Sequence, residues 1–302
     1  MLRLIPEKTN FDFMRWHKLM IAISVAAMIG TIVLLMTVGL NLGTDFAGGV
    51  LMEVQTPKAK ELSSLRESLE KADIGGINLQ QFGGDDRVLI RIGQKDTDEA
   101  QKTAIEKVKT VLGDDATYRR IEFVGPQVGS ELIKKGVWAV TLSSIGILLY
   151  VMMRFKWEFG LSSVFALLHD MLLTVGFFAV TRAEFDLATL AAVLMIGGYS
   201  INDTVVVFDR VREMMQKYRK MPLPDLFNLS INATLSRTIL TGGTAVLALF
   251  ALYFLGGPVL QGFVGALIWG IVVGTYSSVF VATPILLYLG LKEEHHARQE
   301  RR

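Results

Sequence analysis

The chain has 302 residues, of which 51% are hydrophobic and 20% are charged, and its mean hydropathy of +0.41 is higher than soluble proteins of this size usually show. The 31 basic residues nearly balance the 29 acidic ones, so the net charge gives no indication of a nucleic-acid partner. The sequence contains no cysteine, which excludes disulfides, thiolate metal sites and cysteine nucleophiles.

Six apolar segments are long enough to cross about 30 Å of hydrocarbon, a distance that takes roughly 20 helical residues. They cover residues 19–40, 136–153, 159–181, 187 to about 208 and 231–257, and the sixth lies within 260–291. The first segment follows basic residues, as the apolar core of a signal peptide does, but it is too long for such a core and lacks a convincing small-residue cleavage site. We therefore expect it to remain as a membrane anchor.

The Lys and Arg residues of the short connections lie on one side of the expected spans, and basic residues accumulate on the cytoplasmic side. They precede the first span, separate the second from the third, follow the fourth and close the chain: Arg3, Lys8, Arg15, Lys18, Arg154, Lys156, Arg210, Arg212, Lys217, Arg219, Lys220, Lys292, Arg298, Arg301 and Arg302. The short connections on the other side contain only Arg182. The sequence therefore predicts cytoplasmic termini, with residues 1–18 before the first span, five further spans over 136–291 and a basic tail over 292–302.

Residues 41–135, between the first two spans, have the composition and length of a small extracytoplasmic domain. Their apolar pattern predicts a strand, a helix, two strands around the turn GGDD, a second helix and a last strand, over residues 49–56, 58–72, 77–83, 87–92, 97–113 and 116–125. This order predicts a ferredoxin-like α+β fold, in which two helices cover one face of a four-stranded antiparallel sheet. The other face is either a binding surface or part of a rigid spacer. The expected fold class is thus a polytopic α-helical membrane protein with six transmembrane helices and an α+β domain between helices 1 and 2.

The fourth span carries an acid inside its apolar stretch, in the sequence GYSINDTVVVFDRVR. Asp203 falls about 9 Å short of the expected cytoplasmic end near Asp209, so it lies inside the membrane. A carboxylate at such a depth costs roughly 2.5 to 3.5 kcal/mol unless it is paired, neutralised or hydrated. Arg237 in INATLSRTILTGG lies at a matching depth on the fifth span, which runs in the opposite direction. We therefore predict an ion pair between Asp203 and Arg237.

The predicted pair of Asp203 and Arg237 has two interpretations. In the first, the pair is a static clip that holds two helices together. In the second, Asp203 carries protons, and its polar neighbours host water along the route: Tyr199, Ser200, Asn202 and Thr204. A change in the distance between the acid and the base would then switch Asp203 between accepting and releasing a proton. One elementary charge that crosses 100 mV yields about 2.3 kcal/mol, which is a sufficient drive for such a switch.

A second polar insertion, His169 and Asp170 in LLHDMLL, lies near the middle of the third span. Its side chains either hold neighbouring helices in register or take part in a proton relay. Two aspartates within the membrane also raise the hypothesis of an aspartyl protease, in which two carboxylates share a proton. The expected depths of Asp170 and Asp203, about 16 Å and about 9 Å from the cytoplasmic ends of their spans, argue against such a dyad. We expect no enzymatic activity, cofactor or metal site.

Five motifs resemble those of the SecF family: GTDFAGGV, FVGPQVGSEL, LLHD, GYSINDTVVVFDRVRE and INATLSRTILTGGT. They follow the family's order and spacing over nearly the whole chain. The resemblance implies half of a transporter of the resistance-nodulation-division type, which is attached together with SecD to the SecYEG channel in the bacterial inner membrane. The resemblance further implies that proton flow drives movements of extracytoplasmic domains that draw preproteins across the membrane.

The resemblance also implies roles for particular residues. It assigns Asp203 and Arg237 to the proton pathway, and the pathway's further carboxylate belongs to SecD, so a separate SecD chain is implied. The other candidates for the pathway rest on their positions alone: Asn202, Thr204, His169 and Asp170. The resemblance assigns four residues to a motif at the outer membrane surface that either positions the outer domain or couples it to the membrane: Asp45, Phe46, Gly48 and Gly49. Its glycines would allow a tight entry of the chain into the first strand.

The leading hypothesis is a proton-coupled, non-catalytic translocase subunit whose partners are SecD, SecYEG, the preprotein, membrane lipid and protons. One rival is an efflux permease for small molecules with the same membrane fold, which should require large outer domains rather than one small module. The other rival is a structural assembly subunit without proton traffic. That rival predicts that Asp203→Asn leaves secretion intact as long as the complex remains assembled.

Overall fold

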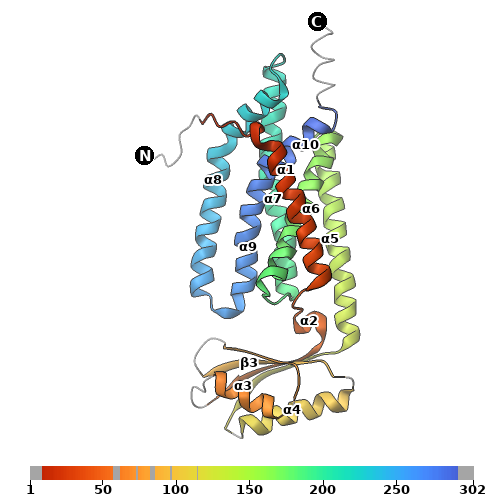
Figure 1. Cartoon of the computed structure of the whole chain (residues 1–302), viewed down its shortest axis with the longest axis vertical. Coiled ribbons are helices and arrows are strands. Elements are labelled where there is room, and N and C mark those ends of the chain that lie inside the picture. The colour runs from red at the N-terminus through yellow and green to blue at the C-terminus, as the bar shows by residue number, and fades with distance from the viewer. Residues whose placement is uncertain are drawn as a thin grey trace.

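The computed structural model describes residues 9–56, 62–72, 74–81, 86–95, 97–113 and 115–291. Several expectations lie wholly or partly outside these residues: the basic residues Arg3 and Lys8, the start of the helix over 58–72, the end of the strand over 77–83, the turn GGDD, and the tail over 292–302. Within them, a bundle of long helices carries a small α+β domain at one end (Figure 1). We call the opposite end of the bundle the basic end, because Arg154, Lys156 and Arg212 lie there.

Six helical stretches form the bundle, and the six spans expected from the sequence are present among the described residues. They are α1 (His17–Thr37), α5 (Pro126–Arg154), α6 (Trp157–Thr181), α7 (Leu187–Lys217), α8 (Leu223–Leu255), and a last stretch made of α9 (Pro258–Ser277), a π-helical turn (Ser278–Ala282) and α10 (Thr283–Tyr288). A short 3-10 turn (Met14–Trp16) precedes α1. Each stretch is long and apolar enough to cross a bilayer, so the chain is a multi-pass membrane protein.

Three helices extend beyond the expected apolar spans. Helix α5 begins at Pro126 rather than at Gly136, with the proline in its first turn, where a missing N–H leaves no helical hydrogen bond unmade. Helix α7 continues to Lys217, and α8 already begins at Leu223. Hydropathy marks only the part of a helix that lies in lipid, so polar extensions of this kind do not register as spans.

The α+β domain contains one antiparallel sheet in the spatial order β2-β3-β1-β4. Its elements are, in chain order, β1 (Gly49–Gln55), α3 (Leu62–Lys71), β2 (Ile77–Gln81), β3 (Arg87–Gly93), α4 (Asp98–Leu112) and β4 (Thr117–Val124). This order with β1 and β3 in the middle is the ferredoxin-like arrangement that the sequence predicts.

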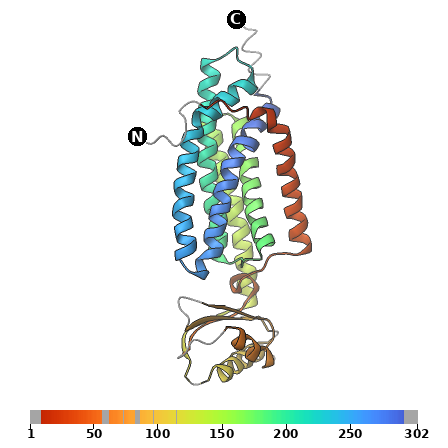
Figure 2. The same cartoon turned by 60° about the vertical axis from the view of Figure 1, so that its left-hand side comes forward.

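Alternation along β1 builds the core of this domain. Val50, Met52 and Val54 are fully buried and share a cluster with Leu69 of α3 and Val108 of α4. Both helices lie on the side of the sheet that points away from the bundle (Figure 1 and Figure 2). The other sheet face is therefore turned toward the bundle rather than toward open solvent.

A one-turn helix that the sequence analysis does not anticipate, α2 (Thr44–Ala47), links α1 to β1. Gly48, with a φ of 74°, caps its end, and the strand begins at Gly49, whose φ is 123°. A side chain at Gly49 would place its Cβ 2.3 Å from the carbonyl oxygen of Ile92. The chain turns here in a way that only glycine allows.

Within the bundle, α6, α7 and α9 pack against one another in the centre, whereas α1, α5 and α8 lie at the outside. Gly274 of α9 faces α7 so closely that an added Cβ would lie 3.0 Å from the Cβ of Ser200. Small residues allow helices to approach in this way. The close contact brings the polar residues at the C-terminal end of α9 next to those of α6 and α7.

Candidate functional site

The acid of the fourth span is buried in the bundle. Asp203 on α7 is only 4% exposed, and the hydroxyls of Thr238 on α8 and Thr275 on α9 lie beside its carboxylate. Oδ2 of Asp203 and Oγ1 of Thr238 are both buried without a hydrogen-bond partner among the described residues. A buried polar atom without a partner costs roughly 1 to 3 kcal/mol, so a proton or a water molecule bound here would stabilise the site.

The predicted ion pair between Asp203 and Arg237 does not form. Arg237 lies near enough to act on Asp203 through its charge, but its side chain is exposed on the outside of α8 and makes no salt bridge with any described residue. Its neighbour Thr238 is 2% exposed and points into the bundle. Successive helical residues are about 100° apart, so Arg237 is turned away from the carboxylate. Depth along the helix predicts the neighbourhood of the arginine but not its face.

The polar neighbours expected around Asp203 separate onto different faces of α7. Asn202 is exposed, whereas Thr204 is 1% exposed. Ser200 does not serve Asp203, because its hydroxyl donates a hydrogen bond to Asp170 on α6. The structure thus divides these residues between two buried acids rather than grouping them around one.

Asp170 is fully buried on α6, and hydrogen bonds reach both of its carboxylate oxygens. Its Oδ1 accepts from Nδ1 of His169 at 2.8 Å. Its Oδ2 accepts from the hydroxyls of Ser277, at 2.7 Å, and of Ser200. This carboxylate therefore connects α6, α7 and the end of α9, and it differs from that of Asp203 in having partners on both oxygens.

His169 continues this network toward α1. Its ring lies 6.2 Å from that of Tyr276, at an interplanar angle of 30°. The Tyr276 hydroxyl lies 2.9 Å from the Met20 carbonyl oxygen, to which it donates, and 2.9 Å from the Ser24 hydroxyl, both on α1. Nε2 of His169 is buried and has no partner in the described part of the chain. A line of polar and aromatic groups thus runs from α1 to Asp170.

A π-helical turn begins directly after the serine that contacts Asp170. The hydroxyl of Thr283, the first residue of α10, donates to the carbonyl oxygen of Ser278 in this turn at 2.8 Å, and the Ser162 hydroxyl of α6 donates to the carbonyl oxygen of Ala282. The wider turn frees carbonyl groups that side chains then satisfy. Such turns are found mostly as single interruptions of α-helices, often beside functional sites.

Sequence analysis missed the side chains of α8 and α9 that complete these sites: Thr238, Thr275, Tyr276 and Ser277. A signal was present in GTYSSVF, where four consecutive polar residues interrupt the sixth apolar span. The signal for Thr238 is weaker, because threonine is common in membrane helices. Among the described residues, no group of three or more His, Asp or Glu side chains lies together as a metal-binding set.

The outer motif lies where the α+β domain joins the bundle, and it consists of Asp45, Phe46, Gly48 and Gly49. Oδ2 of Asp45 accepts a hydrogen bond from the backbone N–H of Leu187, the first residue of α7, at 3.0 Å. Phe46 is 7% exposed and stacks on Phe185 with the ring centroids 5.7 Å apart. The segment that enters β1 is therefore in direct contact with the start of the helix that bears Asp203.

An ion pair also links the sheet to the bundle. Arg91 projects from β3 on the bundle-facing side and pairs with Glu184 in the connection between α6 and α7, and both side chains are less than 20% exposed. Burial lowers the pKa of the Arg91 guanidinium, whereas the charges of Asp186 and Asp45 raise it. An arginine stays charged at any ordinary pH, so three carboxylates converge on one fixed positive charge at this junction.

Two protein families match the chain. Residues 103–292 match the family described as protein export membrane protein SecD/SecF, C-terminal, and residues 33–57 match the family described as the SecD/SecF GG motif. The first match contains both buried acids. The second contains the four residues of the outer motif.

Curated relatives match over nearly the whole chain. A protein translocase subunit SecF from Rhodobacter capsulatus is 44% identical, with 96% of this chain and 92% of the relative covered. A protein translocase subunit SecF from Rickettsia bellii is 42% identical, with 97% of each chain covered.

Two solved structures have the same fold. SecDF of Thermus thermophilus, described as a translocon-associated membrane protein, superposes with a TM-score of 0.81 and 35% identity over 94% of this chain. A SecDF structure in a super-membrane-facing form gives a TM-score of 0.73 and 34% identity over 100% of this chain. The present chain spans only 39% and 41% of those two longer chains.

Proposed function

Because the chain belongs to the SecD/SecF family and matches its SecF members over nearly their whole length, we propose that it acts with SecD as an accessory subunit of the Sec translocase and uses proton flow to promote late steps of protein export. It is a membrane transport component rather than an enzyme. The observation that carries this proposal is the 44% identity to a SecF translocase subunit over 96% of the chain.

The proton-carrying group in this proposal is Asp203. Its burial within a membrane span and the missing partner of its Oδ2 in the described part of the chain support this role, because protonation would remove a costly buried charge. Thr238 and Thr275 would pass the proton or hold a water molecule, since a hydroxyl can both donate and accept. Thr204, buried on the same helix, and His169 with Asp170 would form the rest of the route.

Arg237 and Asn202 would complete the route only when a partner is bound. Both are exposed in this chain alone. The charge of Arg237 within the membrane costs roughly 2.5 kcal/mol or more when nothing covers it. A SecD chain packed against α7 and α8 would shield the arginine and bring its own carboxylate near it. Arg237 would then stabilise the ionised form of whichever acid lies closest.

Coupling to the outer domain would run through the outer motif. Asp45 holds the first N–H of α7, and Asp203 lies further along the same helix. A rigid helix transmits a small displacement at one end to its other residues, so protonation at Asp203 and movement of the α+β domain would share one element. Positioning of the domain by Gly48 and Gly49 is part of the same role, because it fixes where β1 begins.

We further propose the orientation in the bacterial inner membrane. Residues 1–18 and 292–302 lie in the cytoplasm, residues 19–40 and 136–291 form the membrane region, and residues 41–135 form the extracytoplasmic domain. The clustering of Lys and Arg in the connections at the basic end supports this orientation. The α+β domain would then meet the preprotein where it emerges from SecYEG.

The proposal competes with two others, a small-molecule efflux permease and an assembly subunit without proton traffic. The single small domain between α1 and α5 favours the translocase over efflux, because a permease needs outer domains that enclose its substrate. The missing partner of Oδ2 of Asp203 within the described residues favours proton traffic over a static assembly role, since a static contact is better served by a fully satisfied side chain.

The test uses two variants, Asp203→Asn and Arg237→Met, each in the full complex reconstituted in vesicles. Asparagine is close to the acid in shape but cannot carry a proton, so we expect export driven by a proton gradient to fall at least about tenfold while assembly with SecD stays normal. Asp209→Asn is the matched control, because Asp209 lies on the same helix but is exposed and pairs with Arg154 at 3.3 Å. Export and proton flux are measured in the same vesicles.

The outcomes separate the three functions. Normal export by Asp203→Asn would contradict proton coupling and leave an assembly role. A loss of complex formation in the same variant would mean that Asp203 acts as a structural contact. Proton flux that continues without a preprotein but rises with a small molecule would favour efflux.

A further inference from the structure

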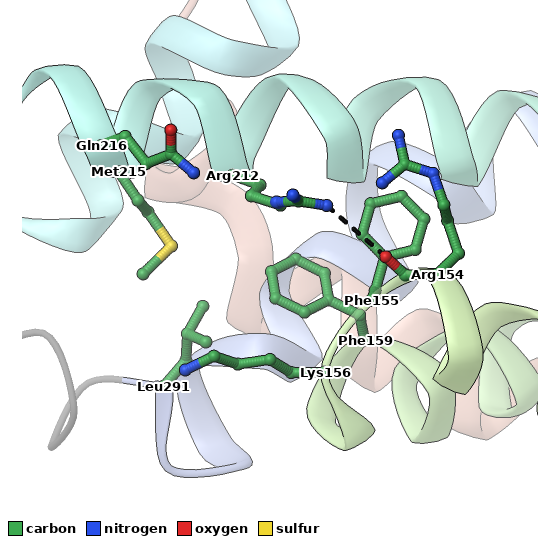
Figure 3. A pocket seen from close by; sticks show the side chains of 8 residues that line it. All are labelled: Arg154, Phe155, Lys156, Phe159, Arg212, Met215, Gln216 and Leu291. Carbon is green, nitrogen blue, oxygen red and sulfur yellow. Dashed lines mark hydrogen bonds between the residues drawn. The ribbon is translucent and has the colours of Figure 1, made fainter.

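A pocket at the basic end lies outside the candidate proton site. It has a volume of about 320 Å³ and is formed by the junction of α5 and α6, the polar extension of α7 and the last described residue, Leu291. Three cationic side chains line it, Arg154, Lys156 and Arg212 (Figure 3). Among the described residues, none that lines the pocket carries a carboxylate.

The two arginines are held in place by contacts other than strong ion pairs. The Arg212 guanidinium donates to the backbone carbonyl oxygen of Arg154 at 3.4 Å, and it makes no salt bridge with a described residue (Figure 3). The Arg154 guanidinium lies 5.1 Å from the ring centroid of Phe155 and meets Asp209 at 3.3 Å at the rim, where both side chains are about half exposed. An exposed pair of this kind is worth less than about 1 kcal/mol, so both guanidinium groups keep donors free for an anion.

The remaining lining is apolar. Phe155, Phe159 and Leu291 are each less than 10% exposed, and Met215 is partly buried beside them. Figure 3 shows the Arg212 side chain reaching from α7 toward the two phenylalanine residues. A site with guanidinium groups above an apolar floor suits a ligand that has an anionic head and an apolar body.

The position of the pocket indicates where that apolar body would lie. The pocket opens where α5 leaves its apolar stretch, and the last two turns of this helix expose Leu149, Tyr150 and Met153 by 55%, 60% and 89%. Trp157, at the start of α6, is 54% exposed. Tryptophan is enriched at the headgroup level of a bilayer, so this residue indicates that the pocket lies near that level. An acyl chain against this face of α5 would place its headgroup at the arginines.

We propose that this pocket binds the phosphate group of an anionic membrane phospholipid. Guanidinium groups bind phosphate oxygens through paired hydrogen bonds, and basic pockets between membrane helices are suited to lipid headgroups. Free phosphate offers the same head without the acyl chains, so it would use the arginines but not the surface of α5. The proposal is independent of proton transport and of export.

The test measures lipid binding to the purified full chain in detergent by native mass spectrometry, with phosphatidylglycerol and phosphatidylcholine as probes. We expect phosphatidylglycerol to bind more tightly than phosphatidylcholine, and Arg154→Gln with Arg212→Gln to remove that preference. Each basic residue near an anionic lipid is worth about 1 kcal/mol, so the double variant should bind phosphatidylglycerol about 25-fold more weakly. The charge-preserving pair Arg154→Lys with Arg212→Lys should keep most of the affinity.

The matched control is Lys134→Gln with Lys135→Gln, which removes two positive charges from the other end of α5. This control should bind phosphatidylglycerol like the unmodified protein. If both double variants weakened phosphatidylglycerol binding equally, the effect would come from total charge rather than from this pocket, and the proposal would be overturned. Equal affinity for the two lipids would overturn it as well. Displacement of phosphatidylglycerol by inorganic phosphate at the same concentration would assign the pocket to soluble phosphate, whereas displacement by an acidic peptide alone would assign it to a protein partner.

Discussion

Asp170 and Asp203 are two buried carboxylates in one bundle, but their surroundings differ. Both oxygens of Asp170 accept hydrogen bonds, whereas Oδ2 of Asp203 has no partner among the residues that the structure describes. A satisfied carboxylate fixes the groups around it, which suits Asp170 to holding α6 against α7 and α9. An unsatisfied oxygen gains a bond when it takes up a proton or a water molecule, which suits Asp203 to a change of protonation state.

The contribution of the Asp170 network can be measured with Ser277→Ala. The substitution removes one of the two hydroxyls that reach Oδ2, so we expect the free energy of unfolding to fall by about 1 to 3 kcal/mol. Unfolding by sodium dodecyl sulfate in mixed micelles gives this value. Thr244→Ala is the control, because that exposed hydroxyl bonds only carbonyls of its own helix, and its loss should cost less than about 0.5 kcal/mol. Equal costs for the two variants would show that Asp170 does not depend on Ser277.

The strand entry at Gly49 gives a second prediction. Alanine there would meet the carbonyl oxygen of Ile92 and would have to adopt a φ of 123°, so we expect Gly49→Ala to destabilise the α+β domain by about 2 to 4 kcal/mol. Pulse proteolysis of the purified protein reports this loss. Gly30→Ala in α1 adds the same methyl group where nothing lies within 4 Å, and it should leave stability unchanged or raise it by up to about 1 kcal/mol. A similar loss in both variants would contradict the steric explanation.

At the residue scale, the sequence predicts how deep in the membrane a side chain lies, but not toward which neighbouring helix it points. Asp170 and Asp203 stand out because an acid in an apolar span has to be accommodated. The face on which Arg237 lies depends on the rotation of α8 about its own axis, which packing with α7 and α9 sets. The pairing of Ser200 with Asp170 rather than with Asp203 has the same cause, since it requires the mutual rotation of α6 and α7.

At the scale of elements, the start of α7 is fixed twice. Asp186 and Thr189 form a capping box at this end of the helix. Asp45 of α2, about 140 residues earlier in the chain, accepts from the N–H of Leu187. The capping box is local and belongs to the helix itself, whereas the second contact makes the helix start depend on the segment that leads into the α+β domain.

The contact from α2 predicts an effect of Asp45→Ala on α7. A side-chain cap is worth about 1 kcal/mol, so the amides of the first turn of α7 should exchange with solvent about fivefold faster in this variant. Hydrogen exchange followed by mass spectrometry measures the change. Asp12→Ala serves as the control, because Asp12 caps Arg15 at the basic end and should leave the first turn of α7 unaffected. Unchanged exchange in Asp45→Ala would mean that the local capping box alone holds the helix start.

Elements with a clear period can be predicted from the sequence, and those without one cannot. The strands of the α+β domain show alternation, for example at Val50, Met52 and Val54, and the sheet follows from their order. Helix α2 is only four residues long and has no period to detect. The first turns of α5 are polar, so the pattern there does not distinguish a helix from a loop.

At the scale of the whole molecule, the exposed surface of the outer helices indicates that a partner protein covers part of the bundle. Arg237 is exposed at a depth where the surrounding surface of α8 is apolar, and Leu247 two to three turns further on is 70% exposed. A monomer in lipid would leave that arginine against acyl chains. We therefore expect SecD to cover the face of α8 that contains Arg237.

This expectation can be tested by labelling, because the chain has no native cysteine. Thr244 lies seven residues after Arg237 and so on the same face of α8, and Thr244→Cys should lose reactivity toward maleimide when SecD is co-expressed. Thr141→Cys on α5 is the control, since Thr141 is likewise exposed and likewise bonds the carbonyl four residues before it. Protection of both positions, or of neither, would place the interface elsewhere.

The two ends of the bundle's chain lie side by side, since His17 at the start of α1 contacts the hydroxyl of Tyr288 at the end of α10 at 3.2 Å. An even number of crossings returns the polypeptide to the side from which it set out. A second set of membrane helices could therefore be joined to this one by a linker alone, with no added crossing. Joining this chain to such a partner would therefore leave the direction of every described span unchanged.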